Sequence, residues 1–348
     1  MSWHGVLGHD AIVEEFRRAI GRGRLASSFL FAGPGGIGKR TFALKLAQAL
    51  LCQTRPEAAL DPCGACASCL QAAAGTHPDV LMVSKPEGKS EIPVQLFIGP
   101  KEHRRQEGLL HEIYLKPRMG GRRIAVIDDA DYLNEEGANA LLKTIEEPPP
   151  RSLQILIGTS PAKQLPTIRS RCQLIRFRPL PLETVAELLV SRGLVGDRSE
   201  ADRLARYSDG SLERALELTD PELWQFRNTL CQRLTETPLK SLELAQAVAS
   251  FVDAAGKEAP ARRNRLRQVV SFAAEFYRQL LRRQCGQGPS SDLELQRFIQ
   301  QSIDAGQSGP EQTAARLNRC LDAATHIDRN ANQATLIECW ADDLVAGR

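Results

Sequence analysis

Short runs of apolar residues alternate with longer amphipathic stretches through the first half of the chain. Such runs predict buried strands, and apolar residues spaced three or four apart predict helices. The predicted strands cover Phe29–Ala32, Val80–Val83, Ile124–Ile127 and Gln154–Ser160, the last ending in polar residues. The predicted helices lie within Val6–Arg24, with Asp10 as the N-terminal capping residue, and at Thr41–Leu51 and Asn134–Glu147. Strands that alternate with helices predict a parallel, doubly wound α/β sheet.

Only helical spacing is present after Leu180. Three short helices are predicted at Leu182–Arg192, Glu200–Tyr207 and Leu212–Leu218. Beyond Pro221 the pattern predicts a helical bundle with breaks near Thr235–Pro238, Gly256–Pro260, Gly286–Ser291 and Gly306–Pro310. We therefore expect an α/β domain at residues 1–177, a small helical domain at 178–220 and an all-α domain at 221–348.

The charges of the chain nearly balance, with a formal net charge of +3 over 348 residues. A charge this small gives no general basic field that would draw the protein to nucleic acid. No apolar run approaches the length of a membrane span, and Met1–Gly5 does not begin a signal-peptide pattern. We expect a cytoplasmic protein with no membrane partner.

A glycine-rich stretch lies between the first predicted strand and the helix that follows it. It contains Gly33, Gly35, Gly36 and Gly38 and is followed by Lys39, which fits the pattern G-x-x-x-x-G-K. Glycines let backbone N–H groups converge on phosphate oxygens, and the lysine adds a full positive charge. The pattern predicts a phosphate-binding loop. A glycine-rich turn without a ligand is the alternative interpretation.

The position after the lysine departs from this motif. A Ser or Thr there would bind Mg²⁺ through its hydroxyl, but the chain has Arg40. Thr41 comes one residue late, which rotates its side chain by about 100° around the helix. The loop is therefore suited to bind a phosphate group but poorly suited to bind Mg²⁺. ATP binding is compatible with this loop, whereas Mg²⁺ binding is disfavoured.

Two adjacent acids, Asp128 and Asp129, follow the third predicted strand. In phosphate-loop proteins one acid at this place holds Mg²⁺, and a second orients the attacking water. The sequence thus places both residues in the predicted nucleotide site. The alternative is that they only cap the helix that follows.

Four of the nine cysteines cluster at Cys52, Cys63, Cys66 and Cys69. Two overlapping C-x2-C units and one more distant cysteine can supply four thiolates to a tetrahedral ion. The pattern predicts a structural zinc site in an insertion at about residues 52–69, which has little apolar content of its own. A redox-active cysteine pair is the alternative. The other cysteines show no ligand spacing.

The order of these motifs resembles the bacterial clamp-loader subunits of DNA polymerase III. The resemblance rests on the phosphate loop, the four cysteines, IDDADYLNEEGANALLKTIEEPP (residues 127–149) and LPTIRSRCQ (residues 165–173). It covers about the first 220 residues. It implies a RecA-like AAA+ domain, a helical lid and a C-terminal collar domain that joins the subunits.

Two kinds of subunit share these marks: the ATP-hydrolysing gamma/tau motors and the mostly rigid delta prime type. Arg40 replaces the residue that binds magnesium, and Asp129 stands where motors usually carry Glu. The third family motif, G-S-x-R, has Glu213 in place of its arginine, and Arg214 is shifted by one residue. Each departure weakens hydrolysis, so the chain resembles the delta prime type. The alternatives are an active gamma/tau-type motor, a stand-alone nucleotide enzyme of the phosphate-loop class and a zinc module with an inactive nucleotide site.

The resemblance also implies that Arg171 of the S-R-C motif is an arginine finger, which reaches the ATP of a neighbouring subunit in trans. Such a residue stabilises charge on the transferred phosphoryl group. The alternative is that Arg169 and Arg171 pair with acids on a surface loop. The implied partners are gamma/tau and delta subunits in a hetero-pentamer, together with the sliding clamp and primed DNA.

Overall fold

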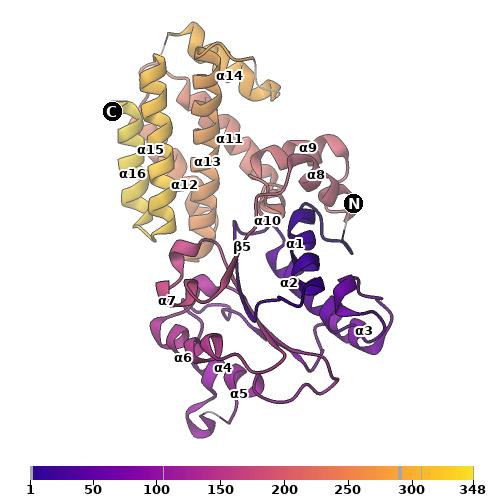
Figure 1. The fold of residues 1–348 in the computed structure, drawn as a ribbon. Coiled ribbons are helices and arrows are strands. Elements are labelled where there is room, and N and C mark those ends of the chain that lie inside the picture. Colours follow the sequence, from indigo (N-terminus) through magenta and orange to yellow (C-terminus); the bar gives the residue numbers. More distant parts are fainter. Residues whose placement is uncertain (1–2, 105, 289–291, 307, 348) are drawn as a thin grey trace. The chain divides into compact units, whose positions relative to one another are not determined.

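The computed structural model describes residues 3–104, 106–288, 292–306 and 308–347 (Figure 1). The chain divides into two compact units, Met1–Glu217 and Leu218–Arg348. The expected separation of a small helical domain at residues 178–220 from the α/β domain stays a prediction.

The first unit contains a five-stranded sheet in which every pairing is parallel. The strand order is β2-β3-β4-β1-β5. The strands are β1 (Ser28–Ala32), β2 (Val80–Val83), β3 (Arg123–Ile127), β4 (Ser152–Gly158) and β5 (Gln173–Arg176). The predicted parallel α/β fold is confirmed. Strand β5 was not predicted, because it is a short edge strand with polar, exposed residues at both ends.

The helices of the first unit are α1 (Asp10–Gly21), α2 (Lys39–Leu50), α3 (Ala67–Ala73), α4 (Gln95–Ile98), α5 (Leu109–Glu112), α6 (Glu135–Glu146), α7 (Pro166–Arg169), α8 (Leu182–Ser191), α9 (Arg198–Tyr207) and α10 (Leu212–Glu217). Short 3₁₀ turns lie at Glu57–Ala59, Lys101–His103, Ala130–Tyr132 and Pro161–Lys163. The prediction that Asp10 caps its helix is wrong. His9 holds the capping position, and Asp10 is the first helical residue, where its charge favours the positive helix end.

Alternate residues of β1 face opposite sides of the sheet, as strand geometry requires. Leu30 joins a buried cluster with residues of α4 to α7, including Phe97, Leu141 and Ile168. Phe29 and Phe31 instead meet aromatic rings from α1 and α2 on the other face. Helices thus cover both faces, as Figure 1 shows for this unit.

The carboxyl ends of the strands bring the candidate motifs together. In the β1–β4 register Ala32 pairs with Gly158, and in the β3–β4 register Ile127 pairs with Leu156. The segments that follow β1, β3 and β4 therefore leave the same edge of the sheet. Parallel α/β sheets bind their ligands at this edge.

The second unit contains only helices among its described residues. They are α11 (Pro221–Leu234), α12 (Ser241–Asp253), α13 (Ala259–Gln284), α14 (Leu293–Asp304), α15 (Pro310–Asp328) and α16 (Gln333–Ala346). The predicted breaks lie between these helices, although residues 289–291 and 307 lie outside the described part. A further break at residues 329–332 was not predicted. Helices α13, α15 and α16 run side by side (Figure 1), and the predicted helical bundle is confirmed.

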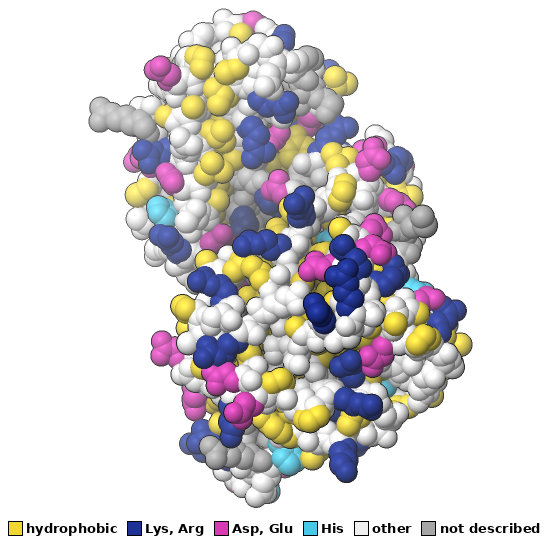
Figure 2. Space-filling model, in the orientation of Figure 1, with side chains coloured by type: hydrophobic (Ala, Val, Ile, Leu, Met, Phe, Trp, Pro, Cys, Tyr) yellow, Lys and Arg dark blue, Asp and Glu magenta, His cyan; other side chains and the backbone are white. Residues whose placement is uncertain are grey.

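Acidic and basic side chains are interspersed over the face drawn in Figure 2. This mixture agrees with the small net charge of the chain. Among the described helices, none has the length and apolar character needed to cross a bilayer.

Arg123, at the start of β3, is a buried charge held by acids from two other segments. Its Nη1 lies 3.4 Å from Asp79 Oδ1, and its Nη2 lies 3.1 Å from Glu112 Oε2. Asp79 also accepts hydrogen bonds from the amides of Arg118 and Met119. Because Arg123 and Asp79 are both buried, the loss of Arg123 leaves the Asp79 carboxylate in the core without its cationic partner.

Arg123→Met should therefore lower the free energy of unfolding by about 3–5 kcal/mol. Arg104→Met is the matched control, because Arg104 pairs with Glu136 on the surface, where such contacts contribute at most about 1 kcal/mol. Urea denaturation of both variants measures the difference. Equal losses would contradict the assignment of Arg123 as a structural charge.

Candidate functional site

The glycine loop connects the buried strand β1 directly to α2, as the sequence predicted. Gly36 and Gly38 have φ angles of +68° and +91°, which side chains disfavour. A Cβ atom added to Gly33 would lie 2.4 Å from the carbonyl oxygen of Phe177. These glycines are thus needed for the shape of the loop, whether or not a phosphate is bound.

Lys39 begins α2 and is buried. Its Nζ donates a hydrogen bond to Gly33 O at 2.7 Å and another to Pro34 O. Burial lowers the pKa of the Lys39 ammonium, while Asp128, Asp131 and Glu213 act in the opposite direction. The Lys39 ammonium is thus hydrogen-bonded to carbonyl groups of its own loop. From this position it could also contact a phosphate bound in the loop.

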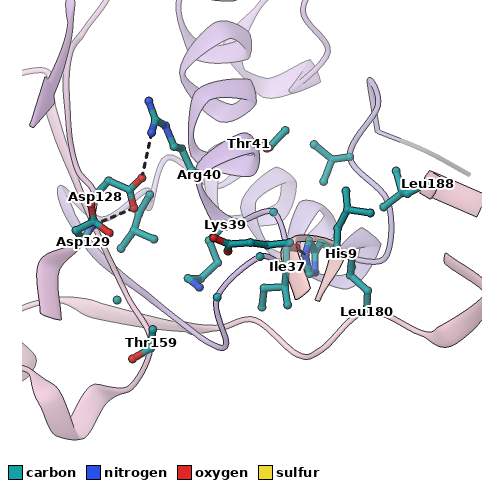
Figure 3. A pocket seen from close by; sticks show the side chains of 18 of the residues that line it. His9, Ile37, Lys39, Arg40, Thr41, Asp128, Asp129, Thr159, Leu180 and Leu188 are labelled. Atoms are coloured by element: carbon teal, nitrogen blue, oxygen red, sulfur yellow. Dashed lines mark hydrogen bonds and ion pairs between the residues drawn. The ribbon is translucent and has the colours of Figure 1, made fainter. Parts of the chain in front are cut away.

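Arg40 and Thr41 point to different sides of α2 (Figure 3). Arg40 Nη1 lies 3.6 Å from Asp128 Oδ2, so that a cation meets the acid that would otherwise help to hold magnesium. Thr41 points away from Asp128. The residues present therefore fit a magnesium ion poorly, because a guanidinium occupies the ligand position and repels a second cation.

Asp128 and Asp129 both line a pocket beside the glycine loop. Burial raises the pKa of Asp128, and its Oδ1 accepts a hydrogen bond from the Asp129 amide nitrogen at 3.0 Å. Asp129 has a φ of +56°, and its Oδ2 accepts a hydrogen bond from the amide of Lys85 at 3.3 Å. The Asp129 carboxylate is thus held by the backbone amide of Lys85, which follows β2, as well as being one methylene shorter than Glu.

The pocket has a volume of about 780 Å³, which lies within the usual range for small-molecule sites. Its lining includes the glycine loop, the two acids and residues of α8 and α10. Helix α10 meets the loop directly, because the Leu212 amide donates to Gly36 O at 2.9 Å. Glu213 lies against the loop: a Cβ on Gly36 would approach the Cβ of Glu213 to 2.5 Å.

Arg214 is turned toward another acid. Its Nη1 lies 2.6 Å from Asp209 Oδ2. Helix α10 thus presents the Glu213 carboxylate to the glycine loop, at the motif position where the resemblance implies that a motor would have an arginine. A carboxylate repels phosphate oxygens, so Glu213 opposes the attraction that the glycine loop and Lys39 would offer to a phosphate.

Asp131 and His9 are among the pocket residues that were not identified from sequence. Asp131 accepts hydrogen bonds from the Thr159 amide at 2.8 Å, from the Thr159 hydroxyl and from Gln164 Nε2 at 3.0 Å. His9 Nε2 lies 2.7 Å from Ile37 O, and burial lowers the pKa of this histidine. Asp131 is the third acid of the DDAD stretch, but no spacing signal indicates its partners, which come from the β4 end.

The four predicted cysteine ligands lie together. The sulfurs of Cys52, Cys63, Cys66 and Cys69 are all within 4.8 Å of one another, and Cys63 Sγ lies 3.9 Å from Cys69 Sγ. A tetrahedral zinc site with Zn–S distances of about 2.3 Å has sulfurs roughly 3.8 Å apart. The four thiols can therefore hold one metal ion, and their arrangement is compatible with zinc.

Backbone amides surround these sulfurs. The amides of Ala65 and Cys66 donate to Cys63 Sγ at 3.5 and 3.3 Å. The Thr54 hydroxyl and these two amides lower the pKa of Cys63 to about 7, whereas burial raises the pKa of Cys69 to about 12. A cation would replace the proton of the buried thiol and keep it ionised.

The cysteine insertion is joined to the sheet domain by buried polar contacts. The Ser68 hydroxyl donates to Leu51 O at 2.6 Å and lies 2.8 Å from His77 Nε2. Gln48 Nε2 donates to Cys69 O at 2.8 Å. His77 thus makes a structural contact with the insertion.

Arg171 lies on the surface between α7 and β5. It lines a separate hollow of about 460 Å³ and not the phosphate-loop pocket. Its Nε lies 2.6 Å from Glu146 Oε1, and its side chain remains 40% exposed. An exposed arginine outside the pocket of its own chain can act on a nucleotide only in another subunit. The finger role itself stays a prediction.

Residues 8–181, which are half of the chain, match the family described as DNA polymerase III, delta subunit. A DNA polymerase III subunit delta' of Pseudomonas aeruginosa is 37% identical over 192 residues, which are 55% of each chain. The subunit delta' of Escherichia coli is 33% identical over 234 residues, which cover 67% of this chain and 66% of that protein. The matched stretches span between about half and two thirds of these relatives' own lengths.

A gamma/tau subunit of Mycobacterium tuberculosis is 33% identical over 223 residues, which cover 63% of this chain and 36% of that protein. Among solved structures, a gamma subunit-related protein of Thermotoga maritima is 14% identical, with a TM-score of 0.37 over 97% of this chain and 99% of its own. That structural likeness is too loose to add to the assignment, which rests on the family match. The chain belongs to the DNA polymerase III, delta subunit family.

Proposed function

We propose that this chain is a delta prime subunit of the clamp loader of DNA polymerase III. In this role it contributes structure and an arginine finger to a complex that opens a sliding clamp and places it on primed DNA. The proposal is supported by the family match and by two relatives that are named as subunit delta'. Its working place would be the cytoplasm, with gamma/tau and delta subunits as partners in a hetero-pentamer.

The observation that carries the distinction from a motor is the contact between Arg40 and Asp128. A motor needs the hydroxyl and the acid of these two positions for Mg²⁺, which neutralises charge during phosphoryl transfer. Glu213 lies beside the loop at the motif position of the motor arginine, so a second positive charge near the phosphates is missing. The loop glycines and Lys39 favour a residual contact with the phosphates of ATP, without hydrolysis.

We also infer that the four cysteines hold structural Zn²⁺. Four thiolates complete a tetrahedral shell, so that such an ion has no open position for substrate. The ion would fasten the insertion near residues 52–69 to α2 and β2, through the contacts of Ser68 and Gln48. A thiol redox role is less well supported, because all four sulfurs converge on one point.

The purified chain should show no ATP turnover above background, with Mg²⁺, primed DNA and clamp present. The same preparation should restore clamp loading when it is added to a mixture that contains only gamma/tau and delta subunits. Clamp loading on primed DNA and released phosphate measure the two activities. Turnover by the chain alone would favour the gamma/tau-type motor, which the similarity to gamma/tau relatives keeps as the second candidate. Failure to restore loading would contradict the assignment to the complex.

A further inference from the structure

Arg171 and Glu146 form an ion pair between two segments that are distant in sequence. Glu146 is the last residue of α6, and Arg171 follows α7. Arg171 Nε lies 2.6 Å from Glu146 Oε1, and both side chains line the same surface hollow. We refer to this ion pair as the Glu146 clasp.

The guanidinium is folded back onto its own chain. In addition to the clasp, Nη1 donates to Thr167 O at 3.1 Å and to Ser170 Oγ at 3.2 Å. These contacts occupy Nε and Nη1 with acceptors of the same subunit. A guanidinium that reaches a phosphate in another subunit must give up part of this set, because its donors have fixed directions.

Buried residues flank the clasp on both sides, while its own two side chains are partly exposed. Ile145, Ile168 and Cys172 are neighbours of the paired residues and belong to one buried cluster. Arg171 and Glu146 are themselves 40% and 45% exposed. A change in the clasp can therefore be a rotation of side chains, without movement of the sheet domain.

Glu146 also occupies an unfavourable place for an acid. The C-terminal end of a helix carries partial negative charge, which repels a carboxylate. The guanidinium of Arg171 compensates for this repulsion in the free chain. If Glu146 kept its place when a phosphate reached Arg171, two negative groups would share one cation.

We propose that Glu146 is a positioning residue that holds Arg171 in a resting place and competes for it with the phosphate of the neighbouring nucleotide. This inference rests on the proposed finger role of Arg171. Docking of the finger then requires the clasp to open. Arg171 therefore leaves Glu146 when a phosphate is bound in the neighbouring subunit, and assembly of the subunits alone is not sufficient.

The strength of the clasp sets the size of the expected effect. Exposed ion pairs correspond to a factor of roughly 1.4 to 5 in an equilibrium, whereas a finger changes the rate by about 10³–10⁵. The contact of Arg171 with the phosphate is therefore stronger than its ion pair with Glu146. The clasp reduces the fraction of Arg171 that reaches the phosphate but does not prevent the contact. The clasp is expected to lower kcat/KM for ATP, because this constant reflects the free-energy difference between the free enzyme with its substrate and the transition state.

The test uses Glu146→Gln in the reconstituted complex, with Glu147→Gln as the matched control. Glu147 is the adjacent exposed acid at the end of the same helix, and its loss changes the net charge equally. We expect Glu146→Gln to raise kcat/KM for ATP by about two- to five-fold and Glu147→Gln to leave it unchanged. In an Arg171→Ala background, Glu146→Gln should have no effect.

The free chain gives a second readout that does not depend on the motor subunits. Phenylglyoxal should modify Arg171 faster in Glu146→Gln than in Glu147→Gln, as followed by mass spectrometry of the peptide. If Glu146→Gln lowers kcat/KM, or matches Glu147→Gln in both measurements, the competition is overturned and the finger can still stand. If Arg171→Ala alone leaves turnover unchanged, the finger role and this inference both fail.

Discussion

Arg171→Ala should reduce ATP hydrolysis at the motor site that borders this subunit by about 10³–10⁵-fold. The reason is that a guanidinium supplied in trans stabilises the charge that develops on the transferred phosphoryl oxygens. Arg171 is suited to this role because it is exposed and lines a hollow separate from its own phosphate-loop pocket. No other part of the reaction is expected to come from this chain.

The measurement requires a complex in which only the bordering motor keeps an intact phosphate-loop lysine, because other active sites would mask the loss. Steady-state release of phosphate then reports this one site. Arg169→Ala is the control, since Arg169 is an exposed arginine two residues away on α7. A loss shared equally by both variants would indicate general electrostatics and would contradict a specific finger.

The substitution should leave the fold intact. The ion pair of Arg171 with Glu146 is exposed, and such pairs contribute about 0–1 kcal/mol to stability. Circular dichroism and assembly with gamma/tau and delta subunits should therefore match those of the unsubstituted chain. Loss of assembly would mean that Arg171 acts at the interface and not on the phosphate.

Cys66→Ser should remove the metal ion from the cysteine insertion and destabilise that insertion. Apparent binding free energies of structural zinc are about 10–16 kcal/mol near neutral pH, so loss of one thiolate removes much of the driving force for local folding. Cys66 also caps α3, because its Sγ accepts a hydrogen bond from the Cys69 amide at 3.4 Å.

Zinc analysis should give one ion for each unsubstituted chain and none for Cys66→Ser. Limited proteolysis should then cut faster within residues 52–77, which lose the contacts of Ser68 and His77. Cys285→Ser is the control, since Cys285 is exposed and lies outside the cysteine group. Absence of zinc from the unsubstituted chain would contradict the assignment of the ion.

Much of the fold could be predicted from local pattern. Strands β1, β3 and β4 are buried along their length and β2 is partly buried, and each contains an apolar run that can be recognised from the local sequence. Strand β5 was missed because only Ile175 of its residues is buried. The N-terminal cap of α1 was misplaced by one residue, since two polar residues stand side by side at this end.

The candidate site was predicted as separate motifs. The residues of the glycine loop, and likewise those of the cysteine cluster, are close together in the chain and have a characteristic spacing. Both motifs can therefore be recognised from the sequence. The Glu146 clasp, the contact of Glu213 with the loop and the hydrogen bonds of Asp131 join residues that are distant in the chain. No spacing rule relates such residues, because their distance depends on the packing of several elements.

The sequence by itself determined the parallel α/β class, the glycine loop, the four grouped cysteines and the presence of Arg40 where a hydroxyl would bind magnesium. These features depend on residue type and on separations of a few positions, which fix geometry within one turn or one strand–loop–helix unit. Only the tertiary structure decided that Arg40 meets Asp128, that Glu213 lies against the glycine loop and that Glu146 holds Arg171. The physical reason is that strand order and helix packing bring the ends of distant segments together, and charges interact over such distances in space whatever their separation in the chain.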